Sequence, residues 1–360
     1  MDEQIFAIQR YGGISRSLYE LAKQFTTTPE LGVELLPIRA PIVNHYVLGN
    51  PGLVAALHTH PAKNSVTSLA NYFAHRTDAR SADIVHNTFY LPRGLTGAKG
   101  ARRVVTIHDM IPELLPKTRR RLDLLTVKRR YAYNADHIIC ISAATRNDLI
   151  RFYPDITAPI SIVHLGVDPV FAPNVSKWSE LPERYILFVG NRGGYKDADI
   201  LMKAFTQFSK EIPRVTLLFA GGGKFTSKEK KLMHSLGIIQ SVQQKSVPEA
   251  KMSAVYCNAL FTVFPSRFEG FGLPALESMA SGTATILANA TSLPEVGGDA
   301  ALYFEGGDVT DLAQKMILLA SDHELKENFA KAGITQAACF SWEKCAAETA
   351  VVYQTTVTSN

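Results

Sequence analysis

The chain has 360 residues, of which 46% are hydrophobic and 20% charged, and its formal net charge is +5. This composition is typical of a globular protein and excludes a disordered chain, and at ~150 residues per domain the length predicts two domains. The apolar runs are too short for a transmembrane helix, and the N-terminus lacks the features of a secretory signal. The four cysteines form no Cys-x-x-Cys pair, so we expect buried thiols in a reducing compartment, with neither disulfides nor a zinc site.

Short apolar runs alternate with longer segments of helical character along the whole chain. This alternation predicts βαβ units and parallel sheets, and two series of runs predict two Rossmann-like domains. The strands expected in the first half are Val33–Ile38, Ile84–His86, Val104–Ile107, Ile138–Ile141 and Ser161–Val163. Those expected in the second half are Tyr185–Val189, Val215–Phe219, Leu260–Phe264, Ala284–Leu287 and Leu302–Phe304.

A stretch over residues 164–182 that contains glycine and proline predicts a hinge. We therefore expect an N-terminal Rossmann-like domain over 1–165 and a C-terminal one over 181–340, facing each other across a cleft. A last helix over 341–360 is expected to begin near Ser341, a good N-cap residue, and to pack back toward the first domain. In open parallel sheets, ligands bind outside the carboxyl ends of the strands, so site residues are sought there.

The most informative loop follows the expected strand that ends at Phe264. A helix is expected from Pro274, where the missing N–H costs nothing, to Gly282, a natural C′ residue. Gly270 and Gly272 allow the backbone to approach a ligand closely. The unpaired N–H groups at the helix start favour an anion such as a pyrophosphate.

Two carboxylates flank this anion site. Glu269 lies in the loop and Glu277 lies about one turn into the helix. Carboxylates bind sugar hydroxyls while N–H groups bind phosphate, so the arrangement suits a nucleotide sugar. The alternative is a solvated Glu269 and a Glu277 that only complements the helix dipole.

The sequence from Glu269 to Glu277, Glu-Gly-Phe-Gly-Leu-Pro-Ala-Leu-Glu, resembles the signature of the retaining GT-B glycosyltransferases of family 4. Thr291–Ala300 resembles the segment that follows it in that family. The resemblance implies that Glu269 contacts donor-sugar hydroxyls and that Glu277 holds the ribose hydroxyls. It also implies that backbone N–H groups bind sugar and phosphate, and these belong to Gly270, Phe271, Gly272 and Leu273.

Two basic residues follow the expected strand Tyr185–Val189, within Gly-Asn-Arg-Gly-Gly-Tyr-Lys over 190–196. Cleavage of a nucleotide sugar releases a diphosphate, whose developing charge needs fixed cations. The resemblance places Arg192 and Lys196 against that diphosphate, although their spacing is shorter than in many members. The alternative is ordinary surface charge. The resemblance also implies backbone contacts to the nucleotide base near Val247.

In the first domain, His108 and Asp109 follow the expected strand Val104–Ile107. Many members of the resembled family carry a histidine here beside the donor sugar, which implies a catalytic role for His108. Asp109 is expected either to orient the imidazole or to bind the acceptor. Gly12 and Gly13 resemble the family's first glycine loop, in which the backbone approaches phosphate or acceptor.

The N-terminus departs from the family pattern. Members usually begin with a hydrophobic strand before the glycine loop, whereas here Asp2 is already the second residue and only Ile5–Ile8 is apolar. That strand is central in a Rossmann-like sheet, and its loss would leave buried backbone groups without partners. We therefore expect the first strand to be missing, and hypothesise that Met1 is an internal start or that the chain is truncated.

Basic residues are concentrated from Lys117 to Arg130, a segment of net charge +6, which leaves −1 for the rest of the chain. Because duplex-binding proteins are more broadly basic, nucleic acid is not expected as a partner. The segment has helical apolar spacing. It forms either a solvated helix face or a contact with anionic lipid, which attracts each Lys or Arg by ~1 kcal/mol. The expected location is cytoplasmic, with a peripheral position at the inner membrane face where the lipid contact applies.

The leading hypothesis is a retaining glycosyltransferase that moves a hexose from a nucleotide sugar to a glycan or polyprenyl-linked acceptor, without metal or cofactor. The donor is expected mostly on the second domain and the acceptor on the first. The 190–196 segment most resembles mannosyltransferase-like members of surface-polysaccharide pathways, so GDP-mannose is the first expectation and a UDP-hexose the next. Asp197 and Asp199 are interpreted as acids in the first turn of a helix, with a metal site as the alternative.

Two other functions stay open. A nucleotide-sugar 2-epimerase has the same two-domain architecture, and UDP release without an acceptor would favour it. A non-catalytic nucleotide-sugar binder is the second alternative, because the short N-terminus leaves the first sheet in doubt. A dehydrogenase is not expected, since no Gly-x-Gly-x-x-Gly follows a strand.

Overall fold

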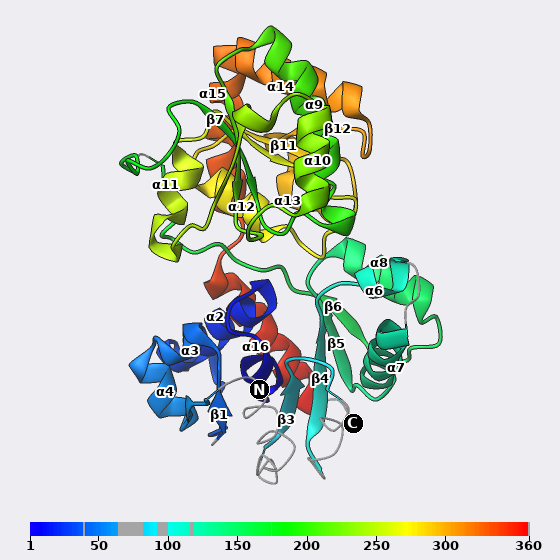
Figure 1. Cartoon of the computed structure of the whole chain (residues 1–360). Helices are drawn as coiled ribbons and strands as arrows, with labels where there is room; N and C mark the ends of the chain where they lie inside the picture. Colours follow the sequence, from blue (N-terminus) through cyan, green and yellow to red (C-terminus); the bar gives the residue numbers. More distant parts are fainter. Residues whose placement is uncertain (39, 64–81, 92–99, 116–118, 174, 359–360) are drawn as a thin grey trace. The chain divides into compact units, whose positions relative to one another are not determined.

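The computed structural model describes residues 1–38, 40–63, 82–91, 100–115, 119–173 and 175–358, and for 119–124 it describes the backbone only. The chain divides into two compact units (Figure 1). Unit 1 combines Met1–Gly166 with Ser341–Asn360, and unit 2 is Val167–Phe340. Both units are α/β structures built on parallel strands, as the alternation of apolar runs predicted.

Unit 2 contains a six-stranded parallel sheet in the order β12-β11-β10-β7-β8-β9. The central strands are continuous apolar runs, as expected where helices cover both faces of a parallel sheet. In β7 the side chains from Tyr185 to Phe188 are at most 1% exposed. The strands are β7 Tyr185–Val189, β8 Thr216–Ala220, β9 Val242–Lys245, β10 Thr262–Phe264, β11 Thr285–Ala288 and β12 Leu302–Phe304.

Helix α9 (Ala198–Glu211) of unit 2 shows the single apolar stripe of an amphipathic helix. Its residues Leu201, Phe205 and Phe208 recur at helical spacing and are fully buried. The other helices are α10 Ser227–Ser235, α11 Met252–Cys257, α12 Leu273–Ala280, α13 Leu293–Gly297, α14 Val309–Ser321 and α15 His323–Ala337, with 3₁₀ turns η3 Gly194–Lys196, η4 Ile239–Ser241, η5 Glu249–Lys251 and η6 Gly298–Ala300.

Unit 1 contains, within its described residues, a parallel sheet in the order β3-β4-β5-β6 and a separate parallel pair, β1 and β2. The strands are β1 Pro41–Ile42, β2 His60–Pro61, β3 Ile84–Asn87, β4 Arg102–Ile107, β5 His137–Cys140 and β6 Ile160–Ile162. The helices are α1 Gln4–Ile8, α2 Gly13–Thr27, α3 His45–Leu48, α4 Pro51–Leu57, α6 Ile111–Leu114, α7 Arg119–Tyr133, α8 Ala143–Phe152 and α16 Trp342–Thr358, with the 3₁₀ turn η1 Pro29–Leu31.

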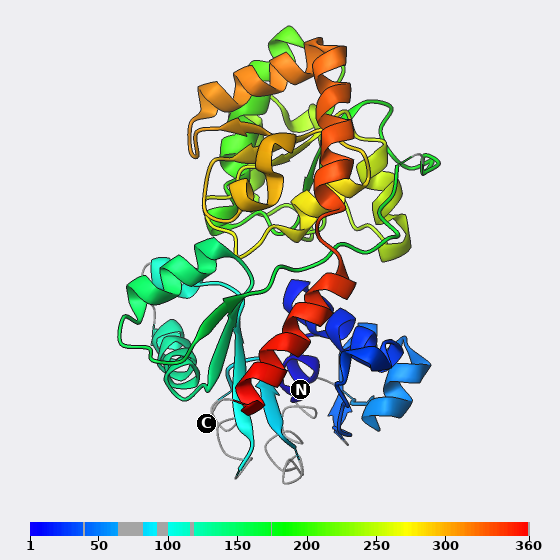
Figure 2. The same cartoon turned by 180° about the vertical axis from the view of Figure 1, so that it is seen from behind.

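The last helix belongs to unit 1. Ser341 caps α16 by accepting the Lys344 N–H at 3.1 Å, as its side chain predicted. The helix packs against α2 and β4, and Figure 2 shows it in red beside α2 in blue. Unit 1 is therefore completed by residues from both ends of the chain.

Two expectations about local structure are corrected, the strand over Val33–Ile38 and the burial of all four thiols, and the segment that precedes the glycine loop is now placed. Val33–Ile38 is not a strand, because Pro37 lacks the N–H that a ladder needs and pairing begins only at β1. The apolar segment Ile5–Ile8 belongs to helix α1. Among the cysteines, Cys140 and Cys345 are buried as expected, but Cys257 is half-buried and Cys339 is exposed.

Candidate functional site

Two of the predicted site residues, Lys196 and Glu269, meet at the point where the unit 2 sheet reverses its direction of growth. The chain builds outward from β7 through β8 to β9, and then from β10 through β11 to β12 on the other side. Open α/β sheets bind ligands at the carboxyl ends of the two strands that flank such a switch point. Here the loops after β7 and β10 carry Lys196 and Glu269. Lys196 Nζ donates to Glu269 Oε1 at 2.6 Å, although the residues are 73 positions apart.

A second ion pair joins the same two loops, and sequence reasoning missed it. Arg267 Nε donates to Asp197 Oδ2 at 2.6 Å, and the Arg267 N–H donates to the Tyr195 carbonyl at 2.9 Å. Burial raises the pKa of Asp197, and the guanidinium opposes that shift. The available signal was a cation two residues before Glu269 and an acid directly after Lys196. Asp197 caps α9 with its backbone and pairs with Arg267.

Arg192 points into a glycine turn. Its Nε donates to Glu229 at 2.7 Å, Nη1 to the Gly221 carbonyl at 3.0 Å, and Nη2 to the carbonyls of Gly223 and Lys224 at 2.9 and 3.1 Å. The guanidinium also lies over the Phe225 ring, 4.7 Å from its centroid. Arg192 therefore fixes this turn in the structure, and its expected contact with a diphosphate beside Lys196 stays a prediction.

The start of α12 has the geometry of an anion site. Gly272 precedes the helix with φ +107°, a conformation that favours glycine, and a Cβ there would lie 2.9 Å from Leu293 Cδ2. Within the described residues, no protein group accepts from the N–H of Gly272 or of Leu273. The Phe271 ring is buried against Phe340, with centroids 5.8 Å apart.

Glu277 lies on α12 and is 9% exposed. Its Oε2 accepts a hydrogen bond from the Tyr256 hydroxyl of α11 at 2.8 Å. The tyrosine thus orients the carboxylate that was expected to hold ribose hydroxyls, and no sequence signal singled it out. Val247 follows the edge strand β9, two strands away from β7, and stands apart from the Lys196–Glu269 pair.

In unit 1, His108 follows β4 and is 4% exposed. Burial lowers its pKa to about 3, with a further contribution from Lys128, so the imidazole is neutral. The ring hydrogen-bonds the backbone at Thr88, whereas Nε2 is buried without a partner among the described residues. An unpaired buried nitrogen is costly in a folded chain, and this one is available to a ligand hydroxyl.

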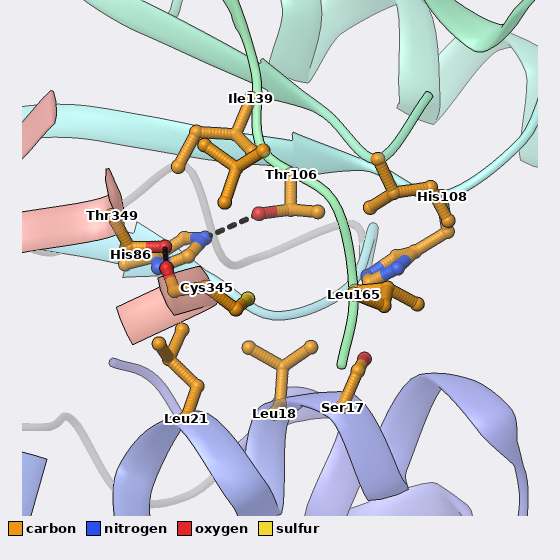
Figure 3. Close-up of a pocket in the computed structure, with 12 residues that line it drawn as sticks. Ser17, Leu18, Leu21, His86, Thr106, His108, Ile139, Leu165, Cys345 and Thr349 are labelled. Atoms are coloured by element: carbon orange, nitrogen blue, oxygen red, sulfur yellow. Dashed lines mark hydrogen bonds between the residues drawn. The ribbon is translucent and has the colours of Figure 1, made fainter. Parts of the chain in front are cut away.

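His86, a neighbour of this site, is fully satisfied by protein groups. Its two ring nitrogens lie 2.6 Å from the Tyr353 hydroxyl of α16 and 2.7 Å from the Thr106 hydroxyl of β4. Burial lowers its pKa to about 3. Figure 3 shows His86 and His108 on the wall of one small cavity of about 20 Å³, room for one water molecule.

The other candidates of unit 1 have local partners. Asp109 accepts the Ile111 N–H at 3.0 Å, at the start of α6. Gly12 is in close contact with Gln9, whose side chain would collide with a Cβ at that position and accepts the Ser15 N–H at 3.0 Å. Gly12 and Gly13 lead into α2, so this glycine loop is explained at least in part by its own packing.

An aromatic cluster lies beside the glycine loop and was not predicted. The Tyr11 ring is 58% exposed and stacks on His45, with centroids 4.7 Å apart and planes at 10°. Tyr46 packs edge-on against Tyr11 at 5.5 Å. Exposed tyrosine combines an apolar face with a polar hydroxyl, the combination that suits a sugar ring.

The basic segment forms helix α7, as predicted, but one of its cations is buried. Lys128 Nζ pairs with Glu113 at 2.9 Å and donates to the Asp109 carbonyl at 2.7 Å. Arg129 and Arg130 are exposed. Lys117 and the side chains of Arg119, Arg120 and Arg121 lie outside the described residues, so only the exposed end of the helix bears on the predicted lipid contact.

Two absences hold for the described part of the chain. No three His, Cys, Asp or Glu side chains there come together as a metal ligand set. None of its helices combines the length and the apolar character needed to cross a bilayer.

The comparisons with known proteins agree with this geometry. Residues 175–336 match the family model described as glycosyl transferases group 1, and residues 11–171 match that of glycosyltransferase family 4. The O-antigen chain mannosyltransferase B of Escherichia coli is 29% identical over 286 residues, 74% of this chain and 72% of that protein. An MMP α-(1→4)-mannosyltransferase of Mycolicibacterium hassiacum is 28% identical over 76% of this chain and 70% of its own length.

Solved structures show the same fold. HepE of Anabaena, solved in complex with UDP and glucose, has a TM-score of 0.74 at 16% identity, and the match covers 96% of this chain and 97% of that one. Sucrose-phosphate synthase of Thermosynechococcus elongatus has a TM-score of 0.67 at 21% identity, over 80% and 76% of the two chains. With one family model on each half, the chain belongs to the GT-B glycosyltransferases, with a family 4 N-terminal domain and a group 1 C-terminal domain.

Proposed function

We propose that this glycosyltransferase moves a hexose, mannose first, from a nucleotide sugar to a glycan or polyprenyl-linked acceptor in surface-polysaccharide synthesis, with retention of configuration. The observation that carries the proposal is the Lys196–Glu269 pair at the switch point of the unit 2 sheet. Mannosyltransferases among the relatives support mannose as the transferred sugar. GDP-mannose is therefore the first donor proposed, and a UDP-hexose is the next candidate.

Different donor residues bind the diphosphate, the ribose and the base of the nucleotide sugar. The N–H groups of Gly270, Phe271, Gly272 and Leu273 and the dipole of α12 hold the diphosphate. Glu277, oriented by Tyr256, holds the ribose hydroxyls. The backbone near Val247 contacts the base. This division places the bond between sugar and phosphate beside Lys196 and Glu269.

The reaction breaks the bond between the anomeric carbon and the phosphate oxygen and forms one to the acceptor oxygen on the same face. The acceptor proton passes to the leaving phosphate oxygen. Lys196 stabilises the charge that develops on the diphosphate. Glu269 accepts hydrogen bonds from donor-sugar hydroxyls, and the neutral His108 offers Nε2 as an acceptor to another hydroxyl of that sugar.

The acceptor side is assigned to unit 1, at the cytoplasmic face of a membrane. Gly12 and Gly13 form its loop, with Asp109 at the end of β4. The exposed Tyr11 ring offers a stacking face for an acceptor sugar. The exposed end of α7 contacts anionic lipid.

The electrostatic role given to Lys196 makes a divalent metal unnecessary. We therefore expect product formation to continue in excess EDTA at the rate measured without it. Loss of turnover in EDTA that Mg²⁺ or Mn²⁺ restores would overturn this part of the proposal.

The donor site is tested by thermal shift with GDP-mannose, UDP-glucose, UDP-GlcNAc and NAD. We expect one nucleotide sugar to raise Tm, and Glu277→Ala to abolish that rise because the ribose hydroxyls lose their acceptor. Glu211→Ala, an exposed carboxylate at the end of α9, is the matched control and keeps the shift.

Turnover is then measured with the donor so identified, and NMR of the product gives the anomeric configuration. Retained configuration in an acceptor-dependent product supports the proposal. Inversion, or UDP release without any acceptor requirement, would contradict it.

A further inference from the structure

The Glu269 loop is held in place by two consecutive hydroxyl side chains that follow β11. Thr291 Oγ1 accepts the Glu269 N–H at 3.0 Å. Ser292 Oγ lies 3.0 Å from the Glu269 carbonyl and 2.9 Å from the Phe271 carbonyl, and donates toward both. Both backbone polar groups of Glu269 are therefore fixed by side chains from a segment 22 and 23 positions away.

Thr291 makes its contact from a strained backbone. Its φ is +49°, in the left-handed region, which is an outlier for a β-branched residue. Such a conformation is energetically unfavourable and persists where the surroundings over-determine it. Glycine or asparagine would adopt it at less cost. The strain indicates that this position needs the threonine hydroxyl for some reason other than stability.

The position of that hydroxyl supplies the reason. Glu269 Oε1 accepts a hydrogen bond from Lys196 Nζ at 2.6 Å. The carboxylate keeps this single orientation only when the backbone of Glu269 is itself held in place. Ser292 is fully buried and fixes the carbonyl side. Thr291 fixes the N–H side, which would otherwise have no partner in the loop and could rotate with the peptide plane.

We propose that Thr291 is a positioning residue, whose strained backbone aims its hydroxyl at the Glu269 N–H and thereby sets the direction of the Glu269 carboxylate in the donor site. Thr291 acts through Glu269 and does not touch substrate. This inference rests on the proposed function for its effect on turnover, but the contact itself is tested without substrate.

Three substitutions separate the hydroxyl from the strain. Thr291→Ser keeps the hydroxyl, Thr291→Val keeps the shape and the β-branch without it, and Thr291→Gly removes both hydroxyl and strain. A misplacement of ~1 Å can cost about 10²-fold in rate, so we expect kcat to fall about 10–100-fold in the valine and glycine variants. The serine variant retains kcat within about threefold, and the KM for the donor changes less than kcat in all three.

The control is Thr206→Val. Thr206 is half-buried on α9, and its hydroxyl donates to the Met202 carbonyl at 3.0 Å within the same helix. This variant loses one hydroxyl of comparable burial outside the site, and we expect kcat to be unchanged. Thr291→Gly should unfold at a temperature equal to or above that of the wild type, because the strain is relieved. A glycine variant that is as stable as the wild type but has a lower kcat shows that the threonine is needed to position Glu269 and is not needed for stability.

Amide hydrogen exchange tests the contact independently of any donor. In the peptide that contains Glu269, we expect faster exchange in Thr291→Val and Thr291→Gly, and wild-type exchange in Thr291→Ser and Thr206→Val. Equal protection in all variants would overturn the proposal, as would full turnover in the valine variant. Absence of any transferase activity in the wild type with these exchange differences intact would contradict the proposed function alone.

Discussion

The guanidinium of Arg192 directs four of its five N–H donors at Glu229 and at the carbonyls of Gly221, Gly223 and Lys224. The three glycines 221–223 all have positive φ, so this turn adopts a backbone that few other residues tolerate. A planar, multiply donating side chain can fix such a turn, whereas a lysine cannot. Lys196, in contrast, directs its ammonium at the Glu269 carboxylate.

Arg192→Lys keeps the positive charge but loses the planar guanidinium, which directs several N–H donors at once. We expect it to lower the free energy of unfolding by about 1–3 kcal/mol, because Glu229 and three part-buried carbonyls lose their donors. Lys196→Ala should leave that free energy nearly unchanged and lower kcat by about 10²–10³-fold. Urea unfolding and initial rates measure both. An Arg192→Lys variant that is as stable as the wild type but inactive would instead support the predicted contact between Arg192 and the diphosphate.

Stability should fall in mild acid because two histidines are buried as neutral rings. Burial lowers the pKa of His86 and of His108 to about 3, whereas both titrate at about 6.5 in the unfolded chain. Below pH 6.5 the unfolded state therefore binds more protons than the folded state. The stabilisation is complete above that pH and is lost, at about 1.4 kcal/mol per pH unit for each histidine, as the pH falls toward 3.

His108→Asn removes one of these rings and should reduce the pH dependence of unfolding by one histidine's share. Urea unfolding between pH 7 and pH 5 measures this slope. His323→Asn is the control, because the His323 side chain is 77% exposed, and it should leave the slope as it is. Identical slopes in wild type and His108→Asn would contradict this prediction, because they would show that His108 takes up its proton equally in the folded and the unfolded chain.

At the scale of elements, α7 combines a buried cation with exposed ones. The side chains of Lys128 and Glu113 are 3% and 5% exposed, and Glu113 also accepts from the Tyr153 hydroxyl at 2.6 Å. Removal of one partner leaves a buried charge uncompensated. The sequence shows only a basic run, so the inward direction of Lys128 could not be read from it.

Lys128→Met should therefore destabilise the protein by about 3–5 kcal/mol, which thermal unfolding measures. Arg130→Ala should leave stability unchanged and weaken binding to anionic vesicles by about fivefold, the equivalent of ~1 kcal/mol. Lys210→Ala, at the exposed end of α9, is the charge-matched control. Equal vesicle binding by wild type and Arg130→Ala at low salt would count against the lipid contact.

Strands that are continuous apolar runs could be predicted from the sequence. Strands that are only partly buried could not. Tyr185–Val189 and Leu302–Phe304 match β7 and β12 residue for residue. The edge strand β9, Val-Gln-Gln-Lys, has only one buried residue and carries no apolar signal. The rule that ligands bind at the carboxyl ends of parallel strands likewise predicted that Lys196 and Glu269 belong to one site. The partners of Arg192 and Glu277 are long-range contacts that no local sequence pattern encodes.

At the scale of the molecule, the two units differ in how they are assembled from the chain. Unit 2 is one continuous segment, Val167–Phe340, whereas unit 1 needs Ser341–Asn360 to complete it. Helix α16 buries Trp342, Cys345 and Tyr353 in unit 1. Large buried apolar side chains stabilise a fold by about 1.5–3 kcal/mol each, so the helix contributes an amount comparable to the whole stability of a domain, about 5–15 kcal/mol.

A fragment of residues 167–340 should therefore unfold cooperatively and keep the Tm shift with the donor nucleotide sugar, since every proposed donor residue except His108 lies within it. A fragment of residues 1–166 should fail to fold, because His86 loses its Tyr353 partner and the α2 face loses its cover. Fusion of residues 341–360 to its end through a flexible linker should restore cooperative unfolding. If the 1–166 fragment alone folds as stably as the fusion, α16 packs against unit 1 without being needed for its core.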